Sequence, residues 1–97
     1  MTKYSIYKTE NYNDWIKTQS LKSQRQILER LLKIEENGHF GHIRNLGKIS
    51  ELKFADGRRI YYGIVPHATV ILLLGGNKNG QEKDIKKAAK IFSQIQS

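Results

Sequence analysis

The sequence contains no cysteine, which excludes disulfide bonds and thiolate chemistry. It also has no long hydrophobic run: the most apolar stretch, residues 69–74, is far too short to span a bilayer, and nothing near the N-terminus resembles a signal peptide. No stretch rich in Pro, Gly or Ser divides the chain. We therefore expect a single domain over residues 1–97, in the cytoplasm and without contact to a membrane.

Acidic residues are few, with nine Asp and Glu against 17 Lys and Arg, so the formal net charge is +8 and the sequence pI is about 9.8. Such a charge repels basic partners and concentrates polyanions at the surface. Nucleic acid is therefore the first partner to consider. Because many small basic domains bind no nucleic acid, the positions of the charges have to show whether this chain does.

The first half of the chain predicts one strand and two helices. Residues 3–8 alternate apolar and polar side chains, as a half-buried strand does. Asn11 is the expected N-cap of a short helix that ends near Gln19. Residues 21–36 carry an apolar face at helical spacing, and Gly38 is suited to end that helix in the left-handed conformation.

The second half predicts three antiparallel strands and a final helix. The strand patterns are residues 49–54, 58–65 and 69–75, and the last is apolar at consecutive positions, as expected for a central strand covered on both faces. Asn79 is the expected cap of the final helix, with Glu82 as its N3 partner. The resulting order, β-α-α-β-β-β-α, is an α+β fold in which helices pack on a small, mostly antiparallel sheet and leave part of its other face open.

The turn between the first two strands of this meander decides which side chains share a face. A two-residue turn would set Lys53 opposite Ile60 and mix charged with aliphatic side chains. A three-residue loop with Gly57 in the left-handed position pairs Lys53 with Arg59 instead. The second register gathers four polar side chains on one face, which has the composition of a site: Glu51, Lys53, Arg59 and Tyr61.

Four stretches follow the pattern of a known family. They are Trp15 in the first helix, GHFGHIRNLG at residues 38–47, ELKFADGRRIYY at residues 51–62 and LLLGGNKNGQEKDIKKA at residues 72–88. Over nearly its full length the chain resembles the RelE/HigB toxin superfamily, most closely the phage-derived "addiction module killer protein" branch. It departs from that branch in having Lys53 in place of the usual Arg and in a turn shorter by about two residues.

The resemblance implies a type II toxin-antitoxin toxin that inhibits translation by ribosome-dependent, metal-independent mRNA cleavage. The implied partners are the ribosome with its mRNA and a cognate antitoxin, expected to be a helix-turn-helix protein whose acidic or helical segments cover the basic face. No cofactor is implied. The residues carried over as catalytic are Lys53, Arg59 and Lys78.

Attack of a 2′-hydroxyl on the adjacent phosphate requires a base, stabilisation of the growing charge and an acid for the leaving oxygen. We expect Arg59 to hold the phosphate with its guanidinium and Lys53 and Lys78 to neutralise charge or exchange protons. Further RNA contacts are expected from Tyr61, Arg58, Gln81 and Lys83.

The identity of the proton donor is open in the sequence, because Asp84 occupies the position near the last helix where such toxins often have Tyr or His. We interpret Asp84 as a first-turn carboxylate that complements the helix dipole. His39 and His42 have a spacing that suggests a metal pair, but no further ligands complete a site, so we expect no bound metal.

Two alternatives to the enzyme remain. A binding module of the same fold would block the ribosome or RNA without cleaving it, and would arrest growth while mRNA stays intact. An inert interaction protein would use its basic face only to bind an acidic partner, and its overexpression alone would leave growth unaltered.

Overall fold

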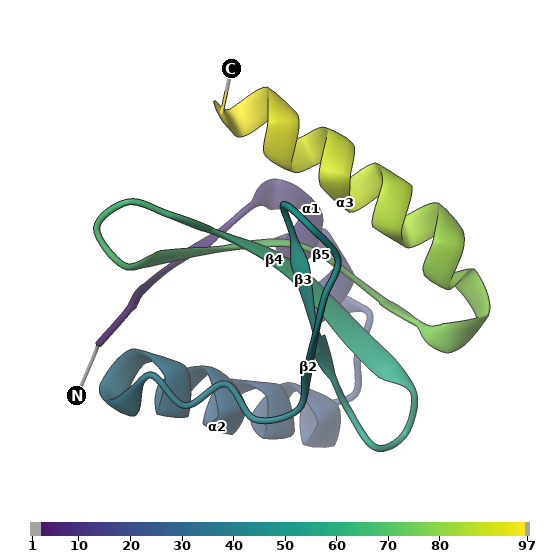
Figure 1. Cartoon of the computed structure of the whole chain (residues 1–97). Helices are drawn as coiled ribbons and strands as arrows, with labels where there is room; N and C mark the ends of the chain where they lie inside the picture. The colour runs from purple at the N-terminus through teal and green to yellow at the C-terminus, as the bar shows by residue number, and fades with distance from the viewer. Residues whose placement is uncertain (1–2, 97) are drawn as a thin grey trace.

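The computed structural model describes residues 3–96 and has a five-stranded sheet with helices on both faces (Figure 1). This is the mixed α+β fold that the sequence predicts, with one additional strand. The elements in chain order are β1 (Ser5–Lys8), α1 (Glu10–Lys17), α2 (Leu21–Asn37), β2 (Ile43–Asn45), β3 (Ser50–Lys53), β4 (Arg58–Val65), β5 (Thr69–Asn77), a 3-10 helix η1 (Lys78–Gly80) and α3 (Gln81–Gln96).

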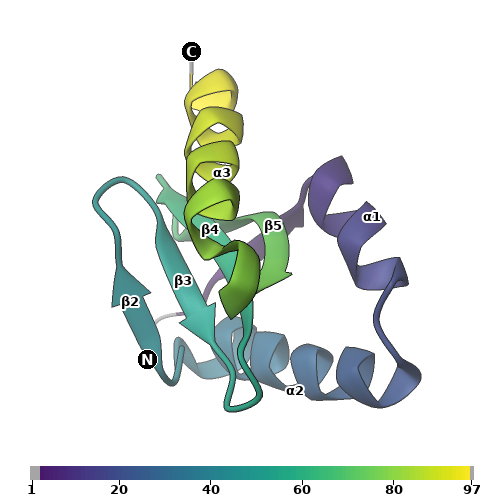
Figure 2. The ribbon, with the colours of Figure 1, turned by 90° about the vertical axis from the view of Figure 1, so that its right-hand side faces the viewer.

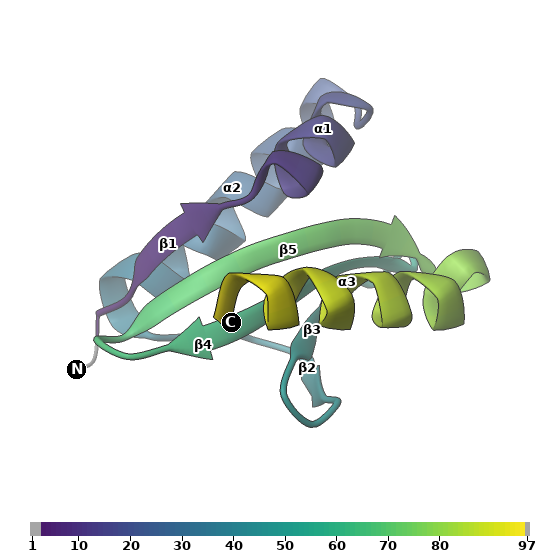
Figure 3. The same ribbon diagram turned by 90° about the horizontal axis from the view of Figure 1, so that it is seen from above.

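The strands lie in the order β1-β5-β4-β3-β2, with β1 parallel to β5 and the other pairs antiparallel. Strand β5 therefore has a neighbour on each edge, and its side chains from Val70 to Leu74 are buried on both faces. Its position inside the sheet, between α1 and α2 on one side and α3 on the other, explains the consecutive apolar residues. Figure 3 shows β1 beside β5, with α3 along β4 and β5.

Two apolar clusters hold the layers together. On one face, α1 and α2 bury side chains against β3, β4 and β5; on the other, α3 packs Ala88 and Phe92 against the sheet. The sequence analysis expects part of the sheet face opposite α1 and α2 to stay open. Helix α3 covers that face where it packs against the sheet. The first cluster contains Tyr12, Ile27, Leu31, Ile34, Leu52, Ile60, Tyr62, Val70 and Leu72, and the second contains Ile49, Tyr61, Ile71, Leu73, Leu74, Ala88 and Phe92.

Helix α1 begins two residues earlier than the sequence predicts, because Thr9 and not Asn11 is its N-cap. The Thr9 hydroxyl accepts a hydrogen bond from the Tyr12 amide at 3.2 Å and donates to the Leu72 carbonyl at 2.8 Å. One buried side chain thus satisfies an orphan amide of the helix and fixes the helix to β5. The helix ends at Lys17, before the expected Gln19.

Helix α2 has the predicted limits within a residue, and Gly38 ends it with φ of 67°. Its apolar face is only partly covered. Ile27, Leu31 and Ile34 are buried, whereas Leu21, Leu28 and Leu32 are exposed by 73%, 51% and 41%. A helix in contact with one sheet buries only the side chains that point at the sheet, so part of a broad apolar face stays exposed.

The β3–β4 hairpin has the predicted three-residue loop, with Gly57 at φ of 95°. Leu52 pairs with Ile60 and Lys53 with Arg59, which confirms the register. The sequence analysis missed β2, whose three residues pair with β3 at the edge of the sheet. Figure 2 shows the β2–β3 hairpin on the side of the molecule opposite α1.

The start of α3 differs from the prediction. Asn77 and not Asn79 acts as a cap: its side chain accepts a hydrogen bond from the Asn79 amide at 2.9 Å and begins the 3-10 turn, after which α3 starts at Gln81. The Asn79–Glu82 capping box is therefore wrong. The cap forms at Asn77 because the extended strand ends there, which leaves the following amides without partners.

The paired glycines of β5 leave room for side chains from the helices. A Cβ atom on Gly75 would lie 2.1 Å from the Trp15 ring, and one on Gly76 would lie 2.1 Å from the Asp84 carboxylate. These residues continue β5 opposite Ile60 and Arg59. Their role is close packing on both faces of the strand.

Candidate RNA-binding cleft

An open cleft of about 510 Å³ lies at the end of the β3–β4 hairpin. It gathers three cationic side chains and one imidazole from four separate segments of the chain. The lining residues are His42, Lys53, Phe54, Ala55, Asp56, Gly57, Arg59 and Lys78. The three residues that the sequence analysis carried over as catalytic, Lys53, Arg59 and Lys78, are all among them.

Strand register brings Lys53 and Arg59 together, because they are directly paired and therefore share a face of the sheet. The Arg59 Nε is buried and has no hydrogen-bond partner among the described residues. A buried nitrogen without a partner is costly, whereas the side chain as a whole is half-buried and lines the cleft, where its guanidinium can bind an anion. Arg59 is thus the cation best prepared to receive a phosphate.

Lys78 lines the cleft next to the hairpin loop. A Cβ atom on Gly57 would stand 3.5 Å from the Lys78 Cδ, so the aliphatic stem of Lys78 lies against the glycine turn. The residue belongs to η1, directly after β5. The left-handed turn at Gly57 and the 3-10 turn therefore act together to place this ammonium group.

His42 lies in the loop before β2 and is anchored through its backbone. Its carbonyl accepts hydrogen bonds from the Lys53 amide at 2.9 Å and from Arg30 Nη2 at 2.5 Å. The sequence analysis considered His42 only as a metal ligand. The spacing of His42 gave no sign of the cleft. Its place there depends on the hydrogen bond from the Lys53 amide, eleven positions away, next to an edge strand that the sequence analysis did not predict.

Arg30 of α2 organises this side of the cleft. Its guanidinium donates to the carbonyls of Phe40, at 3.1 Å, of His42 and of Lys53, and it stacks 4.6 Å from the centre of the Phe54 ring. Burial lowers the pKa of Arg30, and its interaction with Tyr62 opposes that shift. Planar donors in a fixed fork suit such a three-way contact better than a lysine would.

Arg58 does not join the cleft, although it is next to Arg59. Side chains alternate along a strand, so Arg58 points to the α2 face. There it pairs with Asp56 at 2.7 Å, donates to Gln26 at 2.7 Å and lies 5.0 Å from the centre of the Phe54 ring. Although slight burial acts in the other direction, hydrogen bonds from Arg58 lower the pKa of Asp56. These contacts give Arg58 a structural role, and its RNA contact stays a prediction.

Tyr61 is fully buried under α3, so its side chain has no exposed surface for the expected RNA contact. Its hydroxyl is buried without a hydrogen-bond partner among the described residues. Burial is the main cause that raises the pKa of Tyr61 to about 12, and the nearby carboxylates of Glu51 and Asp84 add to it. Sequence reasoning failed here because the register assigns a face and does not show which helix covers that face.

Glu51 is also fully buried on this face, where it joins three elements. Its carboxylate pairs with Arg44 Nε of β2 at 3.0 Å and accepts from Gln81 Nε2 of α3 at 3.2 and 3.3 Å. A buried carboxylate requires such partners. Gln81, predicted to bind RNA, thus holds the start of α3 to the sheet.

The remaining residues predicted near the last helix lie outside the cleft lining. Lys83 is exposed on α3, and Asp84 packs against Gly76 at the start of the same helix. Burial raises the pKa of Asp84, while Lys87 and Lys83 counteract the shift. Within residues 3–96, no cluster of three or more His, Asp or Glu side chains is placed to hold a metal ion. In the same range no helix is long and apolar enough to cross a membrane.

Three solved structures share this fold at low sequence identity. The free RelE toxin mutant of Escherichia coli matches with a TM-score of 0.75 and 16% identity, over 92% of this chain and 97% of that chain. The RelBE2 toxin-antitoxin complex of Mycobacterium tuberculosis gives 0.63 and 15%, over 79% and 100%. The E. coli RelBE complex gives 0.62 and 15%, over 76% and 95%.

Sequence comparison is more specific. An uncharacterized protein of Haemophilus influenzae is 34% identical over 94 residues, which are 93% of this chain and 94% of that protein. The model of the family "Phage derived protein Gp49-like" matches residues 14–93, a range that includes every residue lining the cleft. The chain therefore belongs to the phage-derived Gp49-like family and has the fold of the RelE toxins.

Proposed function

We propose that this chain is the toxin of a type II toxin-antitoxin system and inhibits translation by ribosome-dependent cleavage of mRNA. The observation that carries the proposal is the cleft in which Lys53, Arg59 and Lys78 meet His42. Three cations around one hollow suit a phosphate diester, and a histidine beside them suits proton transfer. The RelE fold supports the same function, since two of the similar structures are toxin-antitoxin complexes.

The proposed reaction is an attack within the RNA. The 2′-oxygen forms a bond to the adjacent phosphorus as a base removes the hydroxyl proton, and the bond from phosphorus to the 5′-oxygen breaks as that oxygen takes up a proton. A 2′,3′-cyclic phosphate and a 5′-hydroxyl end result. Arg59 holds the phosphate through its guanidinium, while Lys53 and Lys78 neutralise the charge that builds on the phosphorane.

We assign one proton transfer to His42. It is the one histidine among the described residues that line the cleft, and Arg30 and Lys53 hold its backbone. Histidine exchanges protons near neutral pH more readily than the lysines beside it. Asp84 has no such role in the proposal, because it packs against Gly76 and does not line the cleft.

Primer extension on a reporter mRNA tests the proposal after brief induction of the wild type and of Arg59→Ala at matched protein levels. We expect new 5′ ends with the wild type and none with Arg59→Ala. Arg58→Ala is the control, because it removes the neighbouring guanidinium on the opposite face and should retain cleavage. Cleavage by both arginine variants would contradict the assigned site.

The position of Asp84 favours a second candidate function. A Tyr or His expected near the last helix is missing there, so a module that occupies the ribosomal site without cutting RNA is the alternative. In the same experiment it would arrest growth and leave the reporter mRNA without new ends. Arg59→Ala would then relieve the arrest, because the phosphate contact is needed for binding as well.

A further inference from the structure

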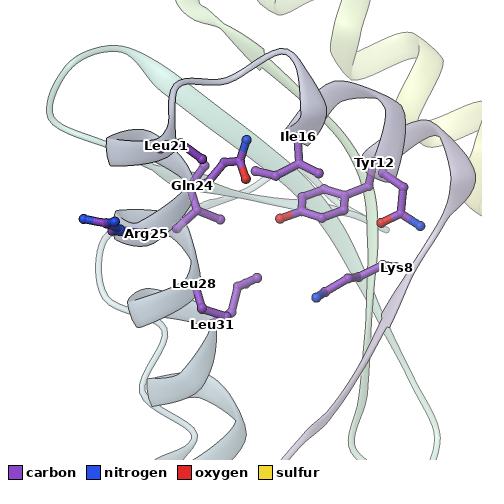
Figure 4. A pocket seen from close by; sticks show the side chains of 10 residues that line it. Lys8, Tyr12, Ile16, Leu21, Gln24, Arg25, Leu28 and Leu31 are labelled. Atoms are coloured by element: carbon purple, nitrogen blue, oxygen red, sulfur yellow. The ribbon is translucent and has the colours of Figure 1, made fainter.

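A second hollow, of about 350 Å³, lies between α1 and α2 (Figure 4). Apolar side chains from both helices face it, together with polar groups at its border. It shares no lining residue with the RNA-binding cleft. The lining consists of Lys8, Tyr12, Asn13, Ile16, Leu21, Gln24, Arg25, Ile27, Leu28 and Leu31, and we call it the helical groove.

The α2 wall of the helical groove has the spacing of a helix-packing seam. Leu21, Gln24, Leu28 and Leu31 follow one another at intervals of three, four and three residues, which is the a/d pattern of a coiled coil. They extend over about 15 Å of helix. Leu21 and Leu28 are exposed by 73% and 51%, although large apolar side chains in such a seam are normally covered. Leu31 at the end of the seam is already buried in the core, so the open part of the wall, from Leu21 to Leu28, suits another helix over about two turns.

Charge at the border determines the kind of helix. Lys8 stands at one side of the groove and Arg25 at the other, and its described lining contains no acidic side chain. Arg25 is one residue after Gln24, in the e position of the seam, where interhelical ion pairs form. A second copy of this chain carries +8, and its amphipathic helix α3 presents Lys83, Lys86, Lys87 and Lys90. The occupant that complements this border is acidic.

We infer that the helical groove is the docking site of an amphipathic, acidic helix supplied by the antitoxin. The inference rests on the proposed function for the identity of the partner. It places the partner's helix on a surface distinct from the basic cleft, which the sequence analysis expected the antitoxin to cover. Leucine or other aliphatic anchors of the partner would pack between Leu28 and Ile16, with carboxylates toward Lys8 and Arg25.

The test uses the products of the two reading frames that flank the gene, each tagged and co-expressed with this chain. We expect one of them to co-purify with the wild type. Leu28→Glu places a carboxylate in the seam and should weaken that complex at least about tenfold, since a charge would be buried against apolar anchors. Lys33→Glu is the control: Lys33 is exposed on the same helix, occupies the f position outside the seam and does not line the groove, so its substitution should leave the affinity unchanged.

Arg25→Glu provides a second variant at an exposed position in case Leu28→Glu impairs folding. It should weaken the complex and reduce the dependence of affinity on salt. The inference would be overturned if Leu28→Glu bound with the same affinity as the wild type, or if neither flanking product bound. It would also be overturned if the wild type formed a dimer that Leu28→Glu dissociated. Absence of new mRNA ends on induction would instead count against the proposed ribonuclease, and the binding measurement does not depend on it.

Discussion

At the residue scale, neighbours in sequence have separate tasks and distant residues share one. Arg58 and Arg59 are adjacent, yet the first is held by Asp56 and Gln26 and the second lines the cleft. Lys78, 19 positions after Arg59, shares the cleft with it. Alternation along β4 causes the separation, and the strand order of the sheet causes the convergence.

The first residue-scale prediction concerns His42. In a reconstituted translation reaction, His42→Ala should reduce the rate of mRNA cleavage by about 100-fold, because it removes a proton-transfer group. His39→Ala is the matched control, since it alters the same loop outside the cleft lining and should leave the rate unchanged. The free energy of unfolding of both variants should lie within about 0.5 kcal/mol of the wild-type value. An equal loss of cleavage in the two variants would assign the effect to the loop and not to the imidazole.

At the element scale, the edge strand and the last helix depend on one buried carboxylate. β2 is only three residues long, and the first turn of α3 follows directly after a 3-10 turn. Glu51 pairs with Arg44 of β2 and accepts from Gln81 of α3. The two elements that enclose the polar face of the sheet are therefore joined through β3.

A double-mutant cycle tests this connection by chemical denaturation. Arg44→Met should lower the free energy of unfolding by about 2 kcal/mol, because Glu51 stays buried without its ion pair. Adding Glu51→Gln should restore most of the loss, since an uncharged amide no longer needs the cation. If the two substitutions instead lower stability additively, the ion pair does not couple β2 to β3.

At the scale of the whole molecule, helices on both faces remove the tyrosines of β4 from water. Burial raises the pKa of Tyr62, with an opposing contribution from its hydrogen bond with Ser50. Burial also raises the pKa of Tyr61 to about 12 and the pKa of Tyr12 to about 12. The folded protein therefore retains these phenolic protons at a pH where the unfolded chain releases them.

Stability should consequently depend on alkaline pH. Below pH 10 these tyrosines are neutral in both states and contribute nothing to the pH dependence; between pH 10 and 12 the unfolded chain ionises first, so the free energy of unfolding falls. Urea denaturation at a series of pH values measures the decline. Tyr61→Phe should make it shallower, since one titrating group is removed and its hydroxyl has no partner to lose. An unchanged slope in Tyr61→Phe would show that Tyr61 does not contribute.

Much of the local structure follows from the sequence alone. Hydrophobic periodicity located α2, β4 and β5, Gly38 and Gly57 marked their turns, and the separation of faces chose the register that pairs Lys53 with Arg59. These signals act between residues close in the chain, where spacing and backbone conformation suffice. The N-caps at Thr9 and Asn77 were missed, because several polar residues compete near each helix start.

Tertiary structure alone decided what each face meets. The buried state of Tyr61 and Glu51 depends on α3 crossing that side of the sheet, and the place of His42 depends on Arg30 and on the pairing of β2 with β3. The exposure of Leu28 likewise follows from where α2 lies against the sheet. The pattern of apolar and polar residues shows which face of an element should be buried. Only the packing of elements distant in the sequence determines what covers that face, or leaves it exposed to a partner.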